Sequence, residues 1–237
     1  MITVIKKTTC ALAIFGITSG TAIAESIDVK VIGTIKPPAC TPSLAGGGTL
    51  DYGTINPNTL SDDAFTLLEE KQVEFSITCD AAAKVAIVSS TGRALSAVAQ
   101  DGSLADVALS HFKIFGSTVT PSYGLGLTGT KGIGGYGLRL DPKSVTADST
   151  SVDLIQNDYQ NLGWVIAPTG SLVSTQATVG GLKRNSTWAK TGTLTPISFT
   201  TMSGKFGVQA YINKKSELDL TKPIQLDGLA TLELVYL

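Results

Sequence analysis

A row of apolar side chains near the start of the chain alternates with polar ones. Residues 26–36 read Ser-Ile-Asp-Val-Lys-Val-Ile-Gly-Thr-Ile-Lys, which is typical of an extended strand with two unlike faces. One face carries Ile27, Val29, Val31, Gly33 and Ile35, and Ile32 is the single apolar residue on the other. A strand with one apolar face has to bury that face. We expect it to do so against another molecule, and the alternative is pairing inside its own domain.

Residues 1–24 have the pattern of a secretion signal. Lys6 and Lys7 form a charged start, residues 8–17 are mostly apolar, and Ala22-Ile23-Ala24 supplies small residues for cleavage. The apolar run is too short to span a bilayer. Removal of 24 residues from 237 leaves 213, which fits one large all-β domain or two small ones. We therefore expect export through the inner membrane.

Charge and composition exclude several classes of partner. Without Lys6 and Lys7, 16 of the 18 basic residues stand against 19 acidic ones, a net charge of −3. No basic run indicates nucleic acid or an anionic membrane surface. Hydrophobic residues make up 43% of the chain, enough for a packed core.

Two cysteines remain after the signal is removed, since Cys10 leaves with it. In an oxidising compartment, Cys40 and Cys79 predict one disulfide. The loop it closes would contribute about 4 kcal/mol in the chain-entropy model. The alternative is a pair of buried free thiols.

Short alternating runs separated by Gly, Pro, Asn, Asp and Ser dominate the rest of the chain, which predicts a β-sandwich or barrel. Two weak helical signals are the exceptions, at Ser61–Lys71 and Asp153–Gln160. The predicted strands are 72–79, 84–88, 111–115, 136–140, 163–167, 194–200, 205–212 and 229–237.

Residues 116–137 hold eight glycines. Within them, Gly124-Leu125-Gly126-Leu127-Thr128-Gly129 has the spelling of a dinucleotide fingerprint, but that motif needs a helix after it. More glycine and a predicted strand follow instead. We expect a flexible surface loop or a glycine-rich hairpin, and no cofactor.

Residues for catalysis are scarce. The chain has one histidine, His111. The sequence contains neither a Gly-x-Ser-x-Gly elbow nor residues at the spacing of zinc or calcium ligands. A glycosidase that uses only carboxylates stays open, although nothing favours it. Trp164 and Trp188 could form a sugar platform, but packing in a core or turn is the better expectation. We predict that the protein is not an enzyme, with no catalytic, metal or cofactor residues.

The chain resembles a chaperone–usher pilus subunit. The resemblance rests on the exported alternating strand, its glycine ahead of Pro38-Ala39-Cys40, a second cysteine that closes a strand, and a C-terminal strand with penultimate Tyr236. More narrowly, residues 33–44, with 47–48 and 51–55, are similar to fimbrial-like bacterial proteins that carry a domain of unknown function numbered 1120.

That resemblance implies an immunoglobulin-like sandwich (37–237) without its final strand, a glycine-rich insertion near 116–137, and a leader segment (25–36) that acts as donor strand. The donor side chains would be Ile27, Val29, Val31 and Ile35, with Gly33 where the groove leaves no room. Donor-strand exchange then joins subunits into a fimbrium on the cell surface. The C-terminal residues that would line the groove and contact the chaperone are Leu232, Leu234 and Tyr236.

The implied partners are a periplasmic chaperone, an outer-membrane usher, neighbouring subunits, and a host glycan or protein receptor. The main alternative is an outer-membrane or secreted β-rich protein, such as a carbohydrate-binding adhesin. Low aromatic content and the predicted disulfide disfavour a membrane barrel. A secreted hydrolase is the third reading.

Overall fold

The computed structural model describes residues 26–110, 112–157, 163–173 and 184–237. The predicted signal peptide and His111 lie outside these residues. The chain divides into two units, one ending at Lys36 and one spanning Pro37–Leu237. In the first unit, residues 26–36 form neither helix nor strand. Their apolar side chains are exposed, Ile27 by 91% and Ile35 completely, so this apolar row is unburied.

The second unit is all-β: within the described residues it has strands and short 3₁₀ turns but no α-helix. Its main strands form one curled sheet, with β9 and β10 as a separate hairpin. The strands are β1 Cys40–Leu44, β2 Thr66–Leu67, β3 Lys71–Ala83, β4 Val85–Thr91, β5 Ala97–Val98, β6 Leu104–Ala105, β7 Val107–Leu109, β8 Pro121–Gly124, β9 Leu127–Thr128, β10 Lys131–Gly132, β11 Gly134–Leu140, β12 Thr146–Ala147, β13 Thr150–Asn157, β14 Trp164–Ile166, β15 Asn185–Lys190, β16 Phe199–Ile212 and β17 Ala230–Tyr236.

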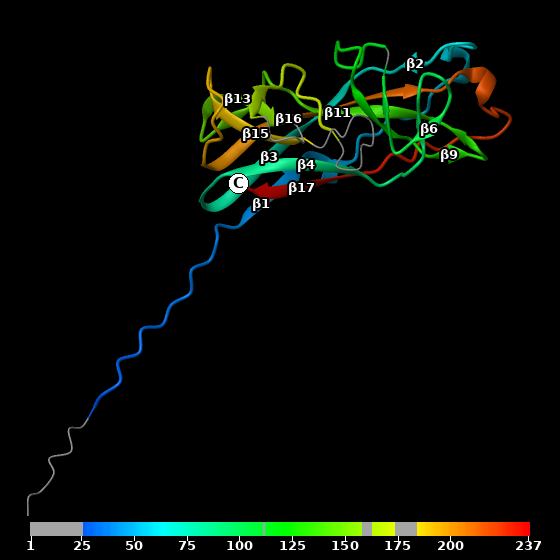
Figure 1. The fold of residues 1–237 in the computed structure, drawn as a ribbon. Coiled ribbons are helices and arrows are strands. Elements are labelled where there is room, and N and C mark those ends of the chain that lie inside the picture. The colour runs from blue at the N-terminus through cyan, green and yellow to red at the C-terminus, as the bar shows by residue number, and fades with distance from the viewer. Residues whose placement is uncertain (1–25, 111, 158–162, 174–183) are drawn as a thin grey trace, which may run out of the picture. The chain divides into compact units, whose positions relative to one another are not determined.

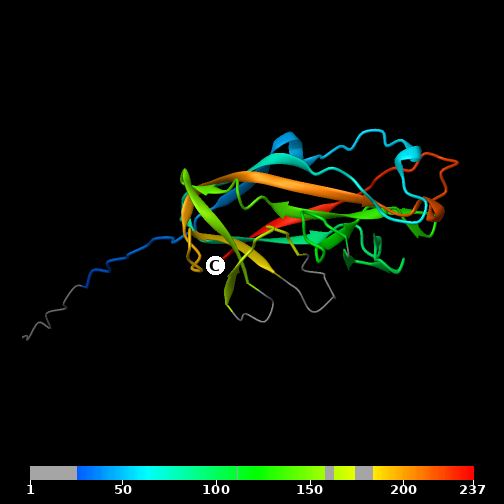
Figure 2. The ribbon, with the colours of Figure 1, turned by 90° about the horizontal axis from the view of Figure 1, so that it is seen from above.

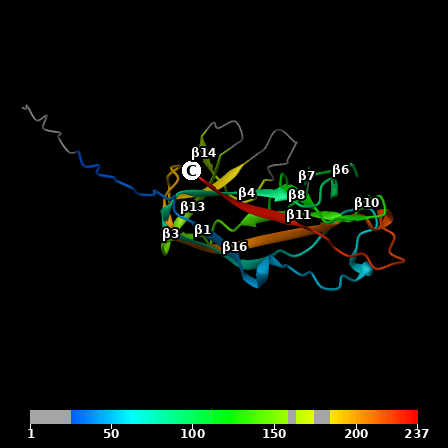
Figure 3. The same cartoon turned by 90° about the horizontal axis from the view of Figure 1, so that it is seen from below.

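The sheet folds round on itself but does not close. Its hydrogen-bonded order runs β17-β4-β15-β13-β12-β16, and from β16 it continues through β3 to β1. The two ends of this path, β17 and β1, come to lie beside each other (Figures 1 and 3). The described strands therefore form a curled sheet with an opening between its first and last strands.

The long strand β16 runs through the middle of the unit and pairs with other strands along both of its edges (Figure 2). One of its edges pairs with β12 and then β11, and the other pairs with β3 and then β2. Buried and exposed residues alternate from Met202 to Phe206, as expected for a strand that covers a core with one face, whereas residues 207–212 are buried or half-buried on both faces.

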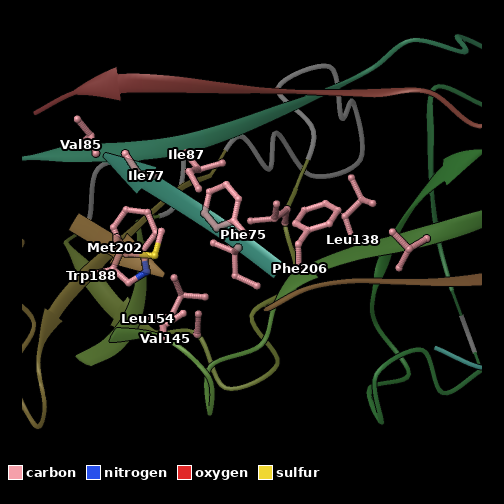
Figure 4. Packing of buried hydrophobic residues seen from close by; sticks show 14 of the residues in the cluster. Phe75, Ile77, Val85, Ile87, Leu138, Val145, Leu154, Trp188, Met202 and Phe206 are labelled. Carbon is pink, nitrogen blue, oxygen red and sulfur yellow. The ribbon is translucent and has the colours of Figure 1, made fainter. Parts of the chain in front are cut away.

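Large side chains from β3, β4, β15 and β16 meet in the space that the sheet encloses (Figure 4). Trp188 is completely buried and packs edge-on against Phe199 at 5.4 Å between ring centroids. Packing in the core, rather than a sugar platform, is therefore confirmed for Trp188. Ile77, Val85 and Ile87 are also buried, so β3 and β4, which follow each other in the chain without pairing, share this core.

The predicted disulfide between Cys40 and Cys79 is confirmed. The two residues are directly opposite each other in the antiparallel β1–β3 pair. The bond therefore fastens the first residue of β1 to the middle of the long strand β3.

Both predicted helices are wrong. Ser61–Lys71 contains β2 and the first residue of β3, and residues 153–157 belong to β13, while 158–160 lie outside the described residues. Leu154 and Ile155 are both buried although they point to opposite faces of β13. A strand covered on both faces loses the alternation that would distinguish it from a short helix.

The predicted strand at 111–115 is also wrong, since residues 112–115 form only an isolated bridge at Ile114. Strand 194–200 begins later than predicted, at Phe199, shortly after Pro196, a residue that has no amide for a ladder. Two alternatives were expected for the glycine-rich segment, and the glycine-rich hairpin is the one that the structure shows. Strand β8 pairs with β11, and the small β9–β10 hairpin connects them. A strand pair, not a helix, follows Gly124–Gly129, so the dinucleotide reading fails.

Candidate functional site

The opening in the sheet is bordered by two unpaired strand edges. Among the described strands β1 pairs only with β3, and β17 pairs only with β4. The other edge of each strand faces the opening, where its amides and carbonyls have no ladder partner. The two edges are bridged at one end, where the amide of Cys40 donates a hydrogen bond of 2.9 Å to the hydroxyl oxygen of Tyr236.

A cavity of about 1110 Å³ continues from this opening toward the far end of the unit. Its floor is apolar and comes from β11, β16 and the two residues that flank the β9–β10 hairpin, Leu125 and Ile133. This volume exceeds the usual range of small-molecule pockets, roughly 300–1,000 Å³. The floor residues are Leu125, Ile133, Tyr136, Leu138, Phe206, Val208, Ala210 and Ile212.

Two irregular segments, residues 47–60 and 218–229, form the walls of this part of the groove. The first wall begins where β1 ends in a 3₁₀ turn, Ala45–Gly48. Gly46, Gly47 and Gly48 all have φ between 64° and 79°, a left-handed conformation that glycine adopts without strain. Three such residues in succession turn the chain out of β1 and start the wall.

The first wall is fixed by the phenol of Tyr52. Its hydroxyl donates to the carbonyl of Val208 at 3.0 Å and accepts from the amide of Ala210 at 3.2 Å. These groups lie where the partner of β16 changes from β3 to β2, so the phenol fills a gap in the ladder. Burial raises the pKa of Tyr52 to about 12, and the hydrogen bond from Ala210 partly opposes this shift.

The second wall is fixed by an ion pair and two backbone bonds. The Arg93 guanidinium holds both carboxylate oxygens of Asp227, with Nε 2.8 Å from Oδ2. The amide of Asp227 donates to Leu125, and the amide of Gly92 donates to Leu229. The hydrogen bonds from Arg93 hold the pKa of Asp227 below its usual range.

Tyr136 forms part of the floor beside this wall. Its side chain is 5% exposed, and its hydroxyl has no hydrogen-bond partner among the described residues. Burial raises the pKa of this phenol, so it stays neutral. A Cβ at Gly228 would lie 2.8 Å from the Tyr136 ring, so the wall can approach the floor this closely only without a side chain.

The predicted C-terminal residues occupy different places along the groove. Leu232 lines the cavity, and Leu234 is half-buried against the core. Tyr236 is 48% exposed and contributes its hydroxyl to the bridge with Cys40. Tyr52 and the wall at 218–229 were not predicted as site residues, because neither lies in a regular strand. The only sequence signal near them was the Asp51-Tyr52-Gly53 block of the family resemblance.

The described residues contain no group of three metal-ligating side chains. In the same part of the chain, no helix has the length and hydropathy to cross a membrane.

Comparison with known proteins places the chain in a family that is defined by sequence. Residues 29–137 match the family model described as "Protein of unknown function (DUF1120)". The chain is 30% identical to Protein GltF of Escherichia coli K12 over 244 residues, which cover 96% of this chain and 94% of that protein. The chain belongs to this family.

A second relative is the uncharacterized protein YhcF of Escherichia coli K12. It is 29% identical over 247 residues, with 98% of this chain and 99% of that protein covered. No solved structure matches the chain.

Proposed function

We propose that this protein is a structural subunit of a bacterial surface fimbria, assembled by donor-strand exchange and contributing to adhesion. The observation that supports this most is the groove between β1 and β17, with an apolar floor and two unpaired edges. In this proposal the domain is a pilin-type sandwich that lacks one strand. The leader segment of a neighbouring subunit supplies that strand.

The leader segment has the properties that such a strand needs. Its apolar row repeats every second residue, and these side chains are exposed in the structure. Full burial of Ile27, Val29, Val31 and Ile35 would contribute roughly 6–12 kcal/mol as an upper bound. The edges of β1 and β17 would add backbone hydrogen bonds on both sides of the inserted strand.

An unfilled groove of this kind favours aggregation, because free strand edges pair with any available chain. We infer that a periplasmic chaperone covers the groove until an outer-membrane usher passes the subunit to its neighbour. Leu232 and Leu234 on β17 would contact the chaperone strand. This assembly also requires export, which the predicted signal at residues 1–24 would provide.

A binding measurement tests the proposal. A labelled peptide of residues 25–36 is titrated into a chain that lacks these residues, and fluorescence anisotropy reports the complex. We expect saturable binding that a peptide with Val29→Ser and Val31→Ser reduces at least tenfold, since two buried aliphatic side chains contribute about 3 kcal/mol or more. Gly33→Leu in the peptide should also weaken binding.

Two variants on one strand provide the matched control. Leu232→Asn changes a side chain that lines the cavity, and Thr231→Asn changes its exposed neighbour. Only Leu232→Asn should weaken binding, with circular dichroism showing that both variants fold. Equal binding of a scrambled peptide, or no binding at all, would rule out the proposed function.

A further inference from the structure

We propose that residues 227–229 form a small flap over the floor of the groove, and that the buried hydroxyl of Tyr136 sets how readily this flap opens. The flap is the last part of the second wall, directly before β17. Its opening and closing take place within the folded domain and need no partner. The flap and the proposed function can therefore fail separately.

The flap lies against the ring of Tyr136. A Cβ at Gly228 would come within 2.8 Å of this ring, which is also stacked on Tyr123 with 5.6 Å between the ring centroids. Tyr136 is only 5% exposed, whereas Asp227, Gly228 and Leu229 are all exposed. These three residues are thus part of a thin cover between the phenol and the solvent.

The hydroxyl of Tyr136 disfavours the closed flap. It is buried and has no hydrogen-bond partner among the described residues. The hydroxyl of the neighbouring Tyr123, by contrast, is paired with the hydroxyl of Ser89 at 2.6 Å. A buried donor without a partner lowers the population of the state that buries it by about 5- to 150-fold, relative to a state in which water reaches it. Opening of the flap lets water reach the hydroxyl of Tyr136.

The attachments of the flap are few and lie near the surface. Nε of Arg93 donates to the carbonyl of Asp227 at 3.0 Å as well as to its carboxylate. The amide of Asp227 donates to the carbonyl of Leu125 at 3.0 Å, and the amide of Gly92 donates to the carbonyl of Leu229 at 2.7 Å. An exposed ion pair shifts an equilibrium by only about 1.4- to 5-fold. Little burial and exposed hydrogen bonds are typical of a segment that opens locally.

The flap is bounded by two fixed points. Leu226 is half-buried against the core, and Ala230 pairs with Thr91 at the start of β17. Opening therefore displaces three residues and leaves the sheet intact. Because Tyr136 and Gly228 both line the groove, its floor has two states at this point. The floor is apolar beneath the closed flap and presents a free hydroxyl when the flap is open.

Hydrogen exchange read at single amides by NMR tests the flap on the full chain. The amides of Gly92 and Asp227 are bonded when the flap is closed, so their exchange reports its opening. They should exchange about a hundredfold faster, or more, than amides in the middle of β16, which are released only by global unfolding. Equal rates would mean that residues 227–229 open only with the whole domain, and would overturn the proposal.

Tyr136→Phe removes the hydroxyl and keeps the ring. Opening then no longer hydrates a buried donor, so exchange at Gly92 and Asp227 should slow by about 5- to 150-fold. Tyr123→Phe is the matched control, because it removes the paired hydroxyl from the other ring of the stack and should not slow exchange of the flap. Unchanged or faster exchange in Tyr136→Phe, or equal slowing in both variants, would overturn the role given to this hydroxyl.

Gly228→Ala tests the contact from the side of the flap. The added Cβ would crowd the ring of Tyr136, so the closed flap should become less populated. We expect exchange at Gly92 to accelerate by about fivefold or more, with circular dichroism showing that the domain still folds. An unaltered rate would mean that the flap does not close on Tyr136, which also overturns the proposal.

Discussion

Tyr52 shows how a single side chain can replace a missing piece of backbone ladder. Its hydroxyl serves a carbonyl and an amide of β16 that no strand reaches, and the same contact fixes the first wall of the groove. Lys71 lies over its ring, with Nζ 5.4 Å from the ring centroid. The residue therefore links the packing of the domain to the shape of the groove.

Tyr52→Phe should lower the free energy of unfolding by about 1–3 kcal/mol, because a carbonyl and an amide lose their partner while the ring remains. Chemical unfolding in urea at neutral pH measures this loss. As a control, Tyr236→Phe removes a half-exposed hydroxyl with one protein partner and should cost less. A Tyr52→Phe chain as stable as the unaltered chain would mean that water serves both backbone groups.

The phenol of Tyr52 also makes the stability of the folded chain depend on pH. Its pKa in the folded chain, about 12, is above the unfolded value near 10, so the folded chain holds this proton longer. Stability from this group is complete below pH 10 and is lost as the pH rises toward 12. Melting temperatures between pH 9 and pH 12 should fall less steeply for Tyr52→Phe. The melting temperature of Tyr52→Phe will still fall with pH to some extent, since burial also raises the pKa of Tyr123, Tyr136 and Tyr211.

At the scale of elements, the segment 218–229 is held in place without belonging to a strand. One ion pair and two backbone bonds connect it to the ends of β4 and β8. In the proposed function such a segment would be preorganised for the inserted strand, and preorganisation lowers the entropy that binding costs.

Asp227→Asn should loosen this wall. Exposed ion pairs contribute about 0.2–1 kcal/mol, so amide exchange at Gly92 and in residues 226–229 of the wall should accelerate by roughly one-and-a-half- to fivefold. Hydrogen-exchange mass spectrometry measures this, and 1 M salt should reproduce part of the effect. Glu217→Gln breaks a different exposed pair, with Lys131, and serves as the control. Equal exchange in both variants would contradict the role of Arg93–Asp227.

Sequence patterns located 72–79, where burial of one face produces alternation, and 205–212, where apolar residues alternate with Lys205, Gly207 and Gln209 although both faces are largely buried. They failed at β13, where both faces are covered, and at the predicted strand 111–115, of which the described residues 112–115 lie in an irregular segment. The walls of the groove were also missed. Their positions depend on long-range bonds such as Tyr52–Val208, which leave no periodic trace in the sequence.

The disulfide and the terminal strand of the candidate site could be predicted from sequence because both lie in regular structure. Cys40 and Cys79 were the only cysteines left after the signal, and residues 229–237 alternate along their length. The opening between β1 and β17 could not be derived in this way. It depends on the order of the strands in the sheet, which brings the first and last of them side by side although they are far apart in the sequence.

In the proposed function, the groove between the two sheet ends is the acceptor and the exposed apolar leader is the donor, so each copy would have one of each. A chain without residues 25–36 keeps the acceptor only and should end any assembly that it joins. Added at one part in ten to full chains, it should limit the mean length to about ten copies. Sedimentation velocity measures the lengths. As a control, a chain that lacks residues 25–36 and carries Leu232→Asn can neither accept nor donate a strand, so it should leave the lengths of the assemblies unchanged. If both chains shorten the assemblies, this prediction is wrong.

The disulfide has a mechanical meaning if copies are joined through their leaders. Tension on a leader would pass along Pro37-Pro38-Ala39 and reach the folded domain at Cys40, the residue that is covalently bonded to β3. The pulling force would then be carried by a sulfur–sulfur bond into the strand that packs along β16 at the centre of the fold, instead of peeling β1 away one hydrogen bond at a time.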